Sequence, residues 1–377
     1  MISKWMVNND NFGKNILQSI YFPKNVVIDK PGIIINLLSK KYGSKTSKKR
    51  TVYYFEDTIV NLQLETFKKL GREKTRELWY KMGKDMGARY MLLAKVKKIS
   101  STLMPFVVKY IFSNLGANGM SVCNGVDFNN RKFSLVLEGK DNIIWRKTKD
   151  GSIIGGLVSG ILSSLCKKNI EAEDTYNEKS DVCKIIANKE IEGKYVPNLK
   201  NLLPLENYDK LNFPDKIPLS KNSVSFRDFV KFKKIEILED GKHTLNNKTI
   251  IPTEIGLLEL MMANYLRIGE YKLLKKSIIG ASEKLCKELL KDKKDVDQKL
   301  NFFKQIFCAL GWGIPLHKFY GKKIIFDFLC PPVCKYGFQY PALVLNGFLN
   351  KIFNENFEIE DITLKNEVPI FTIIYSC

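Results

Sequence analysis

Histidine and arginine are scarce in this chain, and each scarcity argues against a class of function. The 377 residues include 2 histidines, His243 and His317, and neither has a Ser or Cys partner pattern that would make a nucleophile and its base. We therefore expect surface or sheet-edge roles for both. Arginine, the better bidentate ligand of phosphate and guanine, supplies 8 of the 61 basic residues. The net charge of +21 is thus mostly lysine and favours nucleic-acid binding less than its size suggests.

Long apolar runs and a cysteine framework are also missing. No run approaches the roughly 18 apolar residues that a membrane span needs, and residues 1–10 contain no cleavable hydrophobic segment. These two absences predict a cytoplasmic protein with no membrane span. The 8 cysteines show no framework spacing, so we expect reduced thiols, several of them in the core.

The chain does contain short segments that resemble one another. Three short segments recur in the same order: 112–119 with 307–313, 157–162 with 343–349, and 169–174 with 356–361. The length also exceeds the roughly 250–300 residues at which single cores stop growing. We therefore predict a duplicated domain: an N-terminal repeat with an N-terminal extension over residues 1–192, a Pro/Lys/Asn-rich linker over 193–225, and a more divergent C-terminal repeat over 226–377.

Both repeats show the same order of expected elements. In the N-terminal repeat, we expect an apolar stretch at 26–28, a helix at 33–38, an exposed basic loop at 39–50, helices over 58–98, 103–115 and 151–165, and strands at 133–137 and 183–187. In the C-terminal repeat, the corresponding helices are expected at 271–290, 301–310 and 341–353, and the strands at 324–328 and 370–375. This order predicts an α+β fold of two similar units, each an antiparallel sheet with helices packed on it.

Two pairs of glycines lie one turn apart inside expected helices. Gly83 and Gly87 form one pair, and Gly156 and Gly160 form the other. Each glycine costs about 1 kcal/mol relative to alanine in a helix interior, and the usual compensation is the close approach of another backbone. The pairs therefore predict tight helix packing. The stretch 151–160 lacks the Gly-Lys-Ser/Thr ending of a phosphate-binding loop, so we do not expect nucleotide binding there.

Several of these features together resemble a known family. They are the helix 79–90 with its glycine pair, the Leu115-Gly116 stop, the small-residue helix 155–162, an acidic strand with Glu171, Glu173 and Asp174, and Cys183 beyond it. The chain resembles the 4-vinyl reductase-like domain, a relative of the transport protein particle (TRAPP) core subunits, over 22–187 and more faintly over 226–375. The resemblance implies an apolar pocket and dimerisation through helices. Here the two repeats would form an intramolecular pseudo-dimer, so a monomer or small assembly is expected.

Some sensors of this family hold zinc through a Glu and cysteines near the acidic strand. Here Glu173 and Cys183 are the only ligands we can assign to such a site, so no zinc and no other cofactor is expected. Cys330 and Cys334 are the only close cysteine pair and are weak metal candidates. The prolines between them favour a rigid turn of core thiols instead.

Paired carboxylates occur at Glu173-Asp174 and again at Glu360-Asp361. Adjacent residues on a strand point to opposite faces, so neither pair forms an acid/base dyad. A structural role, such as capping a helix or pairing with lysine, is the favoured interpretation. No catalytic residue is predicted, and an enzyme acting on a tetrapyrrole-like substrate rests on the family's name alone.

These observations favour a non-enzymatic, cytoplasmic small-molecule-binding or scaffold protein whose partner is a small apolar ligand or a protein. The predicted ligand pocket is lined by Met82, Gly83, Met86, Gly87, Phe133, Leu135, Leu137, Gly156 and Gly160. The alternative is a basic, nucleic-acid-associated regulatory protein, which would use a basic contact loop. That loop contains Lys40, Lys41, Lys48, Lys49 and Arg50, and the competing interpretation is a solvated loop.

Overall fold

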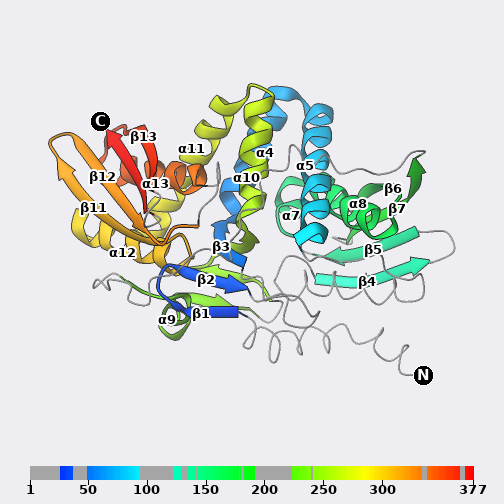
Figure 1. The fold of residues 1–377 in the computed structure, drawn as a ribbon, viewed down its shortest axis with the longest axis horizontal. Coiled ribbons are helices and arrows are strands. Elements are labelled where there is room, and N and C mark those ends of the chain that lie inside the picture. Colours follow the sequence, from blue (N-terminus) through cyan, green and yellow to red (C-terminus); the bar gives the residue numbers. More distant parts are fainter. Residues whose placement is uncertain are drawn as a thin grey trace. The chain divides into compact units, whose positions relative to one another are not determined.

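The described residues form two compact units that are interleaved along the chain. The computed structural model describes residues 26–36, 49–93, 122–129, 134–140, 142–177, 179, 182–191, 223–238, 241–332, 338–365 and 370–377 (Figure 1). The first unit takes the described residues of 63–204 and 237–243, and the second takes those of 26–62, 205–236 and 244–377. This division by contacts differs from the repeat boundaries at 192 and 226, which remain a prediction.

The first unit is built on a four-stranded antiparallel sheet of order β4-β5-β7-β6. Its elements are the end of α4 (Glu56–Leu70), α5 (Arg72–Leu93), β4 (Val122–Asn129), β5 (Ser134–Lys140), α7 (Trp145–Thr148), α8 (Ser152–Cys166), β6 (Asn169–Asn177) and β7 (Val182–Ile191). Helix α8 packs on β6 and β7, and α5 packs on α8 (Figure 1). Leu135, Leu162 and Ile185 are buried between sheet and helix, because alternate residues of a strand face the same side.

A second four-stranded antiparallel sheet, of order β11-β12-β14-β13, has the same chain path as the first. The remaining elements of the chain are β1 (Val26–Lys30), β2 (Ile33–Asn36), β3 (Lys49–Phe55), α9 (Phe226–Lys231), β8 (Ile235–Ile237), β9 (His243–Leu245), β10 (Lys248–Glu254), α10 (Ile255–Arg267), α11 (Tyr271–Leu289), α12 (Val296–Ala309), β11 (Ile314–Tyr320), β12 (Lys323–Leu329), α13 (Gln339–Phe353), β13 (Glu358–Lys365) and β14 (Ile370–Ser376). A further six-stranded sheet has the order β1-β2-β3-β10-β9-β8, so β3 and β10 pair at its centre.

The predicted α+β class is confirmed, but the helix predicted at 33–38 is wrong. Ile33–Asn36 forms strand β2, which pairs with β1 across a turn at Gly32, where φ is +70°. Three consecutive isoleucines suit a strand, because β-branched side chains fit the pleated surface better than a helix. The pattern over 58–98 contains two helices, since Gly71 takes φ +80° between α4 and α5. The helix expected at 103–115 lies outside the described residues.

A buried arginine on strand β3 forms hydrogen bonds to the β1–β2 turn and to other backbone segments of the second unit. Arg50 is 1% exposed, and its Nη2 donates to the carbonyl oxygens of Gly32 and Gly311 at 2.9 Å and of Cys330 at 3.1 Å. One guanidinium thus joins backbone segments that are far apart in sequence.

Among the helices that the structure describes, none is long and apolar enough to cross a membrane.

Candidate functional site

The four helical glycines meet in a close seam between α5 and α8. A Cβ placed on Gly83 would lie 2.0 Å from the carbonyl oxygen of Ile153, and one on Gly87 would lie 2.3 Å from that of Leu157. Reciprocally, Gly156 and Gly160 face the α5 backbone: a Cβ placed on Gly156 would lie 2.0 Å from the Tyr80 carbonyl oxygen, and one on Gly160 would lie 2.1 Å from that of Lys84. The predicted tight packing is therefore confirmed. At these four positions the glycine surfaces meet a neighbouring helix instead of an open cavity.

The other members of the predicted pocket are placed separately. Met82 is buried on α5, Met86 is partly exposed, and Leu135 and Leu137 belong to the core between α8 and the sheet. Phe133 lies outside the described residues. A ligand pocket in this part of the first unit remains a prediction. The four glycines could contact a ligand there only through atoms that do not face the neighbouring helix.

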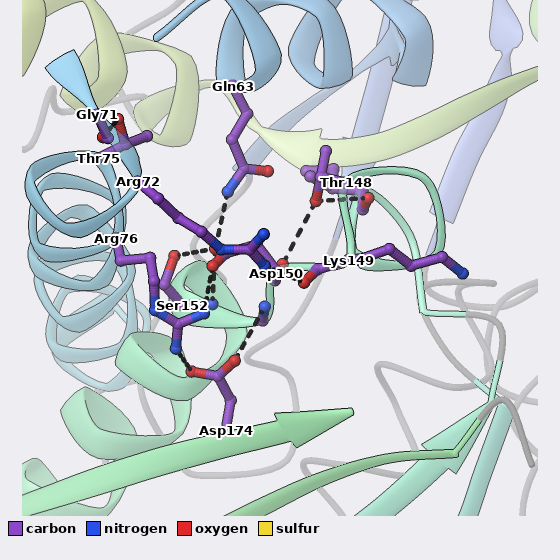
Figure 2. A network of polar contacts seen from close by, with 12 residues as sticks. Gln63, Gly71, Arg72, Thr75, Arg76, Thr148, Lys149, Asp150, Ser152 and Asp174 are labelled. Carbon is purple, nitrogen blue, oxygen red and sulfur yellow. Dashed lines mark hydrogen bonds and ion pairs between the residues drawn. The ribbon is translucent and has the colours of Figure 1, made fainter. Parts of the chain in front are cut away.

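A polar network joins α5, the start of α8 and strand β6 (Figure 2). Arg76 bonds the fully buried carboxylate of Asp150 through Nη1, and its Nη2 lies 2.6 Å from Asp174 Oδ1. The same carboxylates accept hydrogen bonds from backbone N–H groups at the start of α8. Gly151 N donates to Asp174 at 3.1 Å, and Ser152 N donates to Asp150 at 3.2 Å. Gln63 Nε2 also donates to Asp150, at 2.9 Å, and so does the Ser152 hydroxyl.

The chemistry of this network is structural. Helix N-termini are stabilised by negative charge, and a buried carboxylate is tolerated when it is paired and hydrogen-bonded. Burial raises the pKa of Asp174, the Arg76 guanidinium opposes that shift, and the Asp150 carboxylate reinforces it. The structural role predicted for the acidic strand, helix capping and pairing with a base, thus fits Asp174. Glu173 is exposed on the other face of β6, and Glu360 pairs with Lys323 at 2.7 Å.

One turn further along α5, Tyr80 and Lys84 bind the same strand. The Tyr80 hydroxyl donates to Glu171 at 2.5 Å and accepts from Ala172 N at 2.9 Å, while Lys84 Nζ donates to Asn169 at 2.8 Å. Burial and the Glu171 contact raise the pKa of the Tyr80 hydroxyl, so it remains a neutral donor. The side of α5 that carries Arg76, Tyr80 and Lys84 is therefore covered by strand β6.

The basic contact loop needs one correction. Arg50 is not a loop residue available to phosphate, because it lies in β3 and its guanidinium bonds three buried carbonyls. Lys49 begins the same strand. Lys40, Lys41 and Lys48 lie outside the described residues, so their role remains a prediction.

The candidate metal ligands do not converge in the part of the chain that the structure describes. Cys183 is buried in the core, whereas Glu173 faces the exposed side of the same sheet. Cys330 is a buried free thiol, and Cys334 lies outside the described residues. Within the described ranges, no three His, Cys, Asp or Glu residues lie close enough together to hold a metal ion.

The two histidines differ in their positions. His317 lies on β11, the edge strand of its sheet, as predicted, and stacks on Phe326 with ring centroids 5.7 Å apart. His243 lies on β9, an interior strand of the six-stranded sheet, and is partly exposed, so an edge role is wrong for it. Burial lowers the pKa of His243 to about 4.

The shift at His243 predicts a loss of stability in mild acid. Because the unfolded chain binds this proton near pH 6.5 and the folded chain only near pH 4, stability is complete above pH 6.5 and falls as the pH drops below it. Between pH 7 and pH 5, His243 should account for about 2 kcal/mol of the lost unfolding free energy. Urea unfolding of wild type and His243→Gln at both pH values measures this. An equal pH response in the two proteins would contradict it.

A surface hollow lies in the second unit, between the β11–β12 turn and the end of α13. Its volume is about 490 Å³, within the range of small-molecule sites. It is lined by Phe319, Gly321, Lys322, Ile324, Phe353, Glu355, Asn356, Phe357 and Cys377. We call it the aromatic groove. None of the residues of the predicted pocket lines it.

Three phenylalanine rings form the apolar wall of the aromatic groove. The Phe319 and Phe353 centroids are 6.1 Å apart in an edge-to-face arrangement, and those of Phe353 and Phe357 are 5.6 Å apart. Phe319 is 51% exposed although it is a large apolar side chain, whereas Phe357 is buried. An exposed ring that continues into a partly buried and a buried ring can make contact with a further aromatic group.

The rim of the groove is polar but carries no activated nucleophile. Cys377 Sγ donates to the Lys322 carbonyl at 3.4 Å, and a hydrogen bond with Glu355 raises the pKa of the thiol. A thiol held in its neutral form is a poor nucleophile. The rim therefore offers an ammonium, a carboxylate, an amide and a neutral thiol as polar contacts for a ligand.

Sequence reasoning missed this groove because its residues carry no local pattern. Phe319 continues a strand and Phe353 ends a helix, and apolar residues at such positions ordinarily face a core. The groove arises where the β11–β12 turn and the end of α13 diverge. The aromatic content of 319–320 on an edge strand was the one available signal.

Comparisons with known proteins give a limited result. No protein-family model matches the chain, and no curated protein matches it. Among solved structures, the chain is similar to the phenol-responsive sensory domain of the transcription activator PoxR with phenol, at 18% identity and a TM-score of 0.34. The match covers 47% of this chain and 88% of that one. So weak a likeness settles neither fold nor function, and the resemblance to the 4-vinyl reductase-like domain remains a prediction.

Proposed function

We propose that the protein is a non-enzymatic small-molecule-binding protein that takes a small aromatic ligand in the aromatic groove. The observation that carries this proposal is the exposed Phe319 ring, which continues the Phe353–Phe357 wall of a hollow of about 490 Å³. A cytoplasmic location is part of the same proposal.

Binding fits the groove better than catalysis does. Among the described residues that line it, there is no histidine to act as a base, and the single thiol is held neutral. The Phe319, Ile324, Phe353 and Phe357 side chains can bury an aromatic body, while Lys322 and Asn356 can bind one polar substituent. An aromatic ring with one hydroxyl or acidic group has the matching chemistry.

The duplicated 4-vinyl reductase-like architecture belongs to this proposal as well. Its support is that the two four-stranded sheets follow the same path, β4-β5-β7-β6 and β11-β12-β14-β13. The central pairing of β3 with β10 is what a pseudo-twofold arrangement of two repeats would produce. In such a duplication one repeat can keep a ligand site while the other becomes a rigid support.

A pair of neighbouring substitutions tests the groove. Phe319→Ala should weaken binding of 2-naphthol about tenfold, because it removes the exposed ring contact and apolar area from the wall. Tyr320→Ala is the matched control: Tyr320 is 59% exposed on the same strand, but it does not line the groove. Both positions are exposed, so both variants should fold.

Saturation-transfer NMR and isothermal calorimetry with 2-naphthol measure the effect. Decahydro-2-naphthol has the same carbon skeleton and hydroxyl group without an aromatic ring, and it should bind more weakly. Absence of saturable 2-naphthol binding to the wild type, or equal losses in the two variants, would rule out the aromatic groove as the site.

A further inference from the structure

Two lysines converge on one phenylalanine ring at the junction of α9 and α12. Lys234 Nζ and Lys293 Nζ each lie 4.8 Å from the centroid of the Phe302 ring. Lys234 Nζ is also 5.0 Å from the Phe229 centroid, and the Phe229 and Phe302 rings stack. Both aromatic rings are buried.

This lysine pair has no carboxylate partner in the part of the chain that the structure describes. Asp228 accepts from Ser225 N and Oγ in the cap of α9, and Asp295 accepts from Gln298 N at the start of α12. The two acids are therefore bound in helix caps. The salt bridges of the described residues include neither lysine.

The two ammonium groups of the pair repel each other. Burial lowers the pKa of Lys234, and the nearby Lys293 ammonium lowers it further. One cation–π contact would satisfy a single lysine, but a second ammonium at the same ring adds repulsion. An anion that accepts from both nitrogens removes this repulsion.

We propose that Lys234 and Lys293 form a binding site for a phosphate group. A phosphate can accept from two ammonium groups through different oxygens, and such charge-assisted hydrogen bonds are among the strong ones. The two nitrogens share one ring centroid, so their separation is at most about twice 4.8 Å. The site is separate from the aromatic groove and does not depend on the proposed function.

The adjacent surface determines which phosphate compounds could reach the pair. Phe232, which follows α9, is 66% exposed, and Lys231 and Lys233 beside it are exposed as well. Exposed aromatic rings among lysines can stack bases while the lysines contact a phosphate backbone. The phosphate could therefore belong to a free phosphate compound or to a single-stranded nucleic acid, and the two sources are separable by experiment.

The test compares two double variants that lose the same charge. Lys234→Gln with Lys293→Gln removes both ammonium groups and keeps most of each stem, whereas Lys272→Gln with Lys276→Gln removes two exposed lysines from α11. Calorimetry with pyrophosphate and fluorescence anisotropy with a short single-stranded DNA, both at constant ionic strength, report binding. The first double variant should bind about tenfold more weakly than the second.

The outcomes separate the sources of phosphate. If the wild type binds the DNA no more tightly than it binds pyrophosphate, the site belongs to free phosphate compounds. If the wild type binds the DNA more tightly than pyrophosphate, and the DNA affinity falls as salt is added, the site belongs to a nucleic-acid backbone. Lys234→Arg with Lys293→Arg should retain binding, which separates lost charge from lost folding. If neither probe binds the wild type, or the two Gln double variants bind equally, the site does not exist.

Discussion

Gly156→Ala should destabilise the first unit by about 3 kcal/mol or more, although alanine is the better helix former. The added Cβ would lie 2.0 Å from the Tyr80 carbonyl oxygen and 2.8 Å from Lys84 N. Both atoms belong to the α5 backbone, so no side-chain rotation relieves the clash. The helices must separate, and the loss of their contact outweighs the gain in helix propensity.

Its neighbour provides a matched control. Gly155→Ala adds the same methyl group in the same helix, but the nearest atom to its Cβ is Tyr80 Cε2 at 3.7 Å, an ordinary contact. It should leave stability unchanged or raise it. Gly280→Ala in α11, where nothing lies within 4 Å, should stabilise by about 0.5–1 kcal/mol.

Urea unfolding followed by circular dichroism gives the three unfolding free energies. The expected order of stability is Gly280→Ala, then Gly155→Ala, then Gly156→Ala. If Gly156→Ala were as stable as Gly155→Ala, the seam between α5 and α8 would be looser than the structure shows.

The glycine seam also shows what the sequence could reveal of the fold. Glycine spacing one turn apart has a local energetic cost, so it predicted close packing of α5 and α8 without knowledge of the partner. The strand expected at 133–137 overlaps β5, which runs from Ser134 to Lys140. The helix predicted at 33–38 failed because residues 33–36 pair with β1 and β3, and short apolar runs do not distinguish strand from helix.

The candidate sites were less accessible from sequence, for a physical reason. The aromatic groove and the lysine pair each bring together residues from different elements, such as Lys234 and Lys293, whose proximity depends on tertiary packing. Arg50 illustrates the opposite error. Its place at the end of a lysine-rich segment suggested a surface contact, but the carbonyls that bind it lie up to 280 residues away.

Arg76→Met should destabilise the first unit by about 2–3 kcal/mol. Removing one partner of a buried ion pair leaves an uncompensated charge, which costs about 3–5 kcal/mol at fully buried sites. Asp150 is fully buried, but the Arg76 side chain is 36% exposed, so water reduces the cost. Asp174 also loses its partner and keeps only the Gly151 N–H among the contacts described above.

Adding Asp150→Asn to this variant should recover about 1 kcal/mol or more. The amide oxygen introduced by this substitution could still accept from Gln63 and Ser152, while the buried charge is gone. Arg72→Met is the control on the same helix, because Arg72 makes an exposed bond to the Lys149 carbonyl, and its loss should cost less than about 0.5 kcal/mol. Denaturant unfolding of Arg76→Met, Asp150→Asn, their double variant and Arg72→Met beside the wild type completes the comparison. If Arg76→Met lowers the free energy of unfolding no more than Arg72→Met does, the network contributes no stability. The presence of two carboxylates at the N-terminus of α8 would then require a functional explanation.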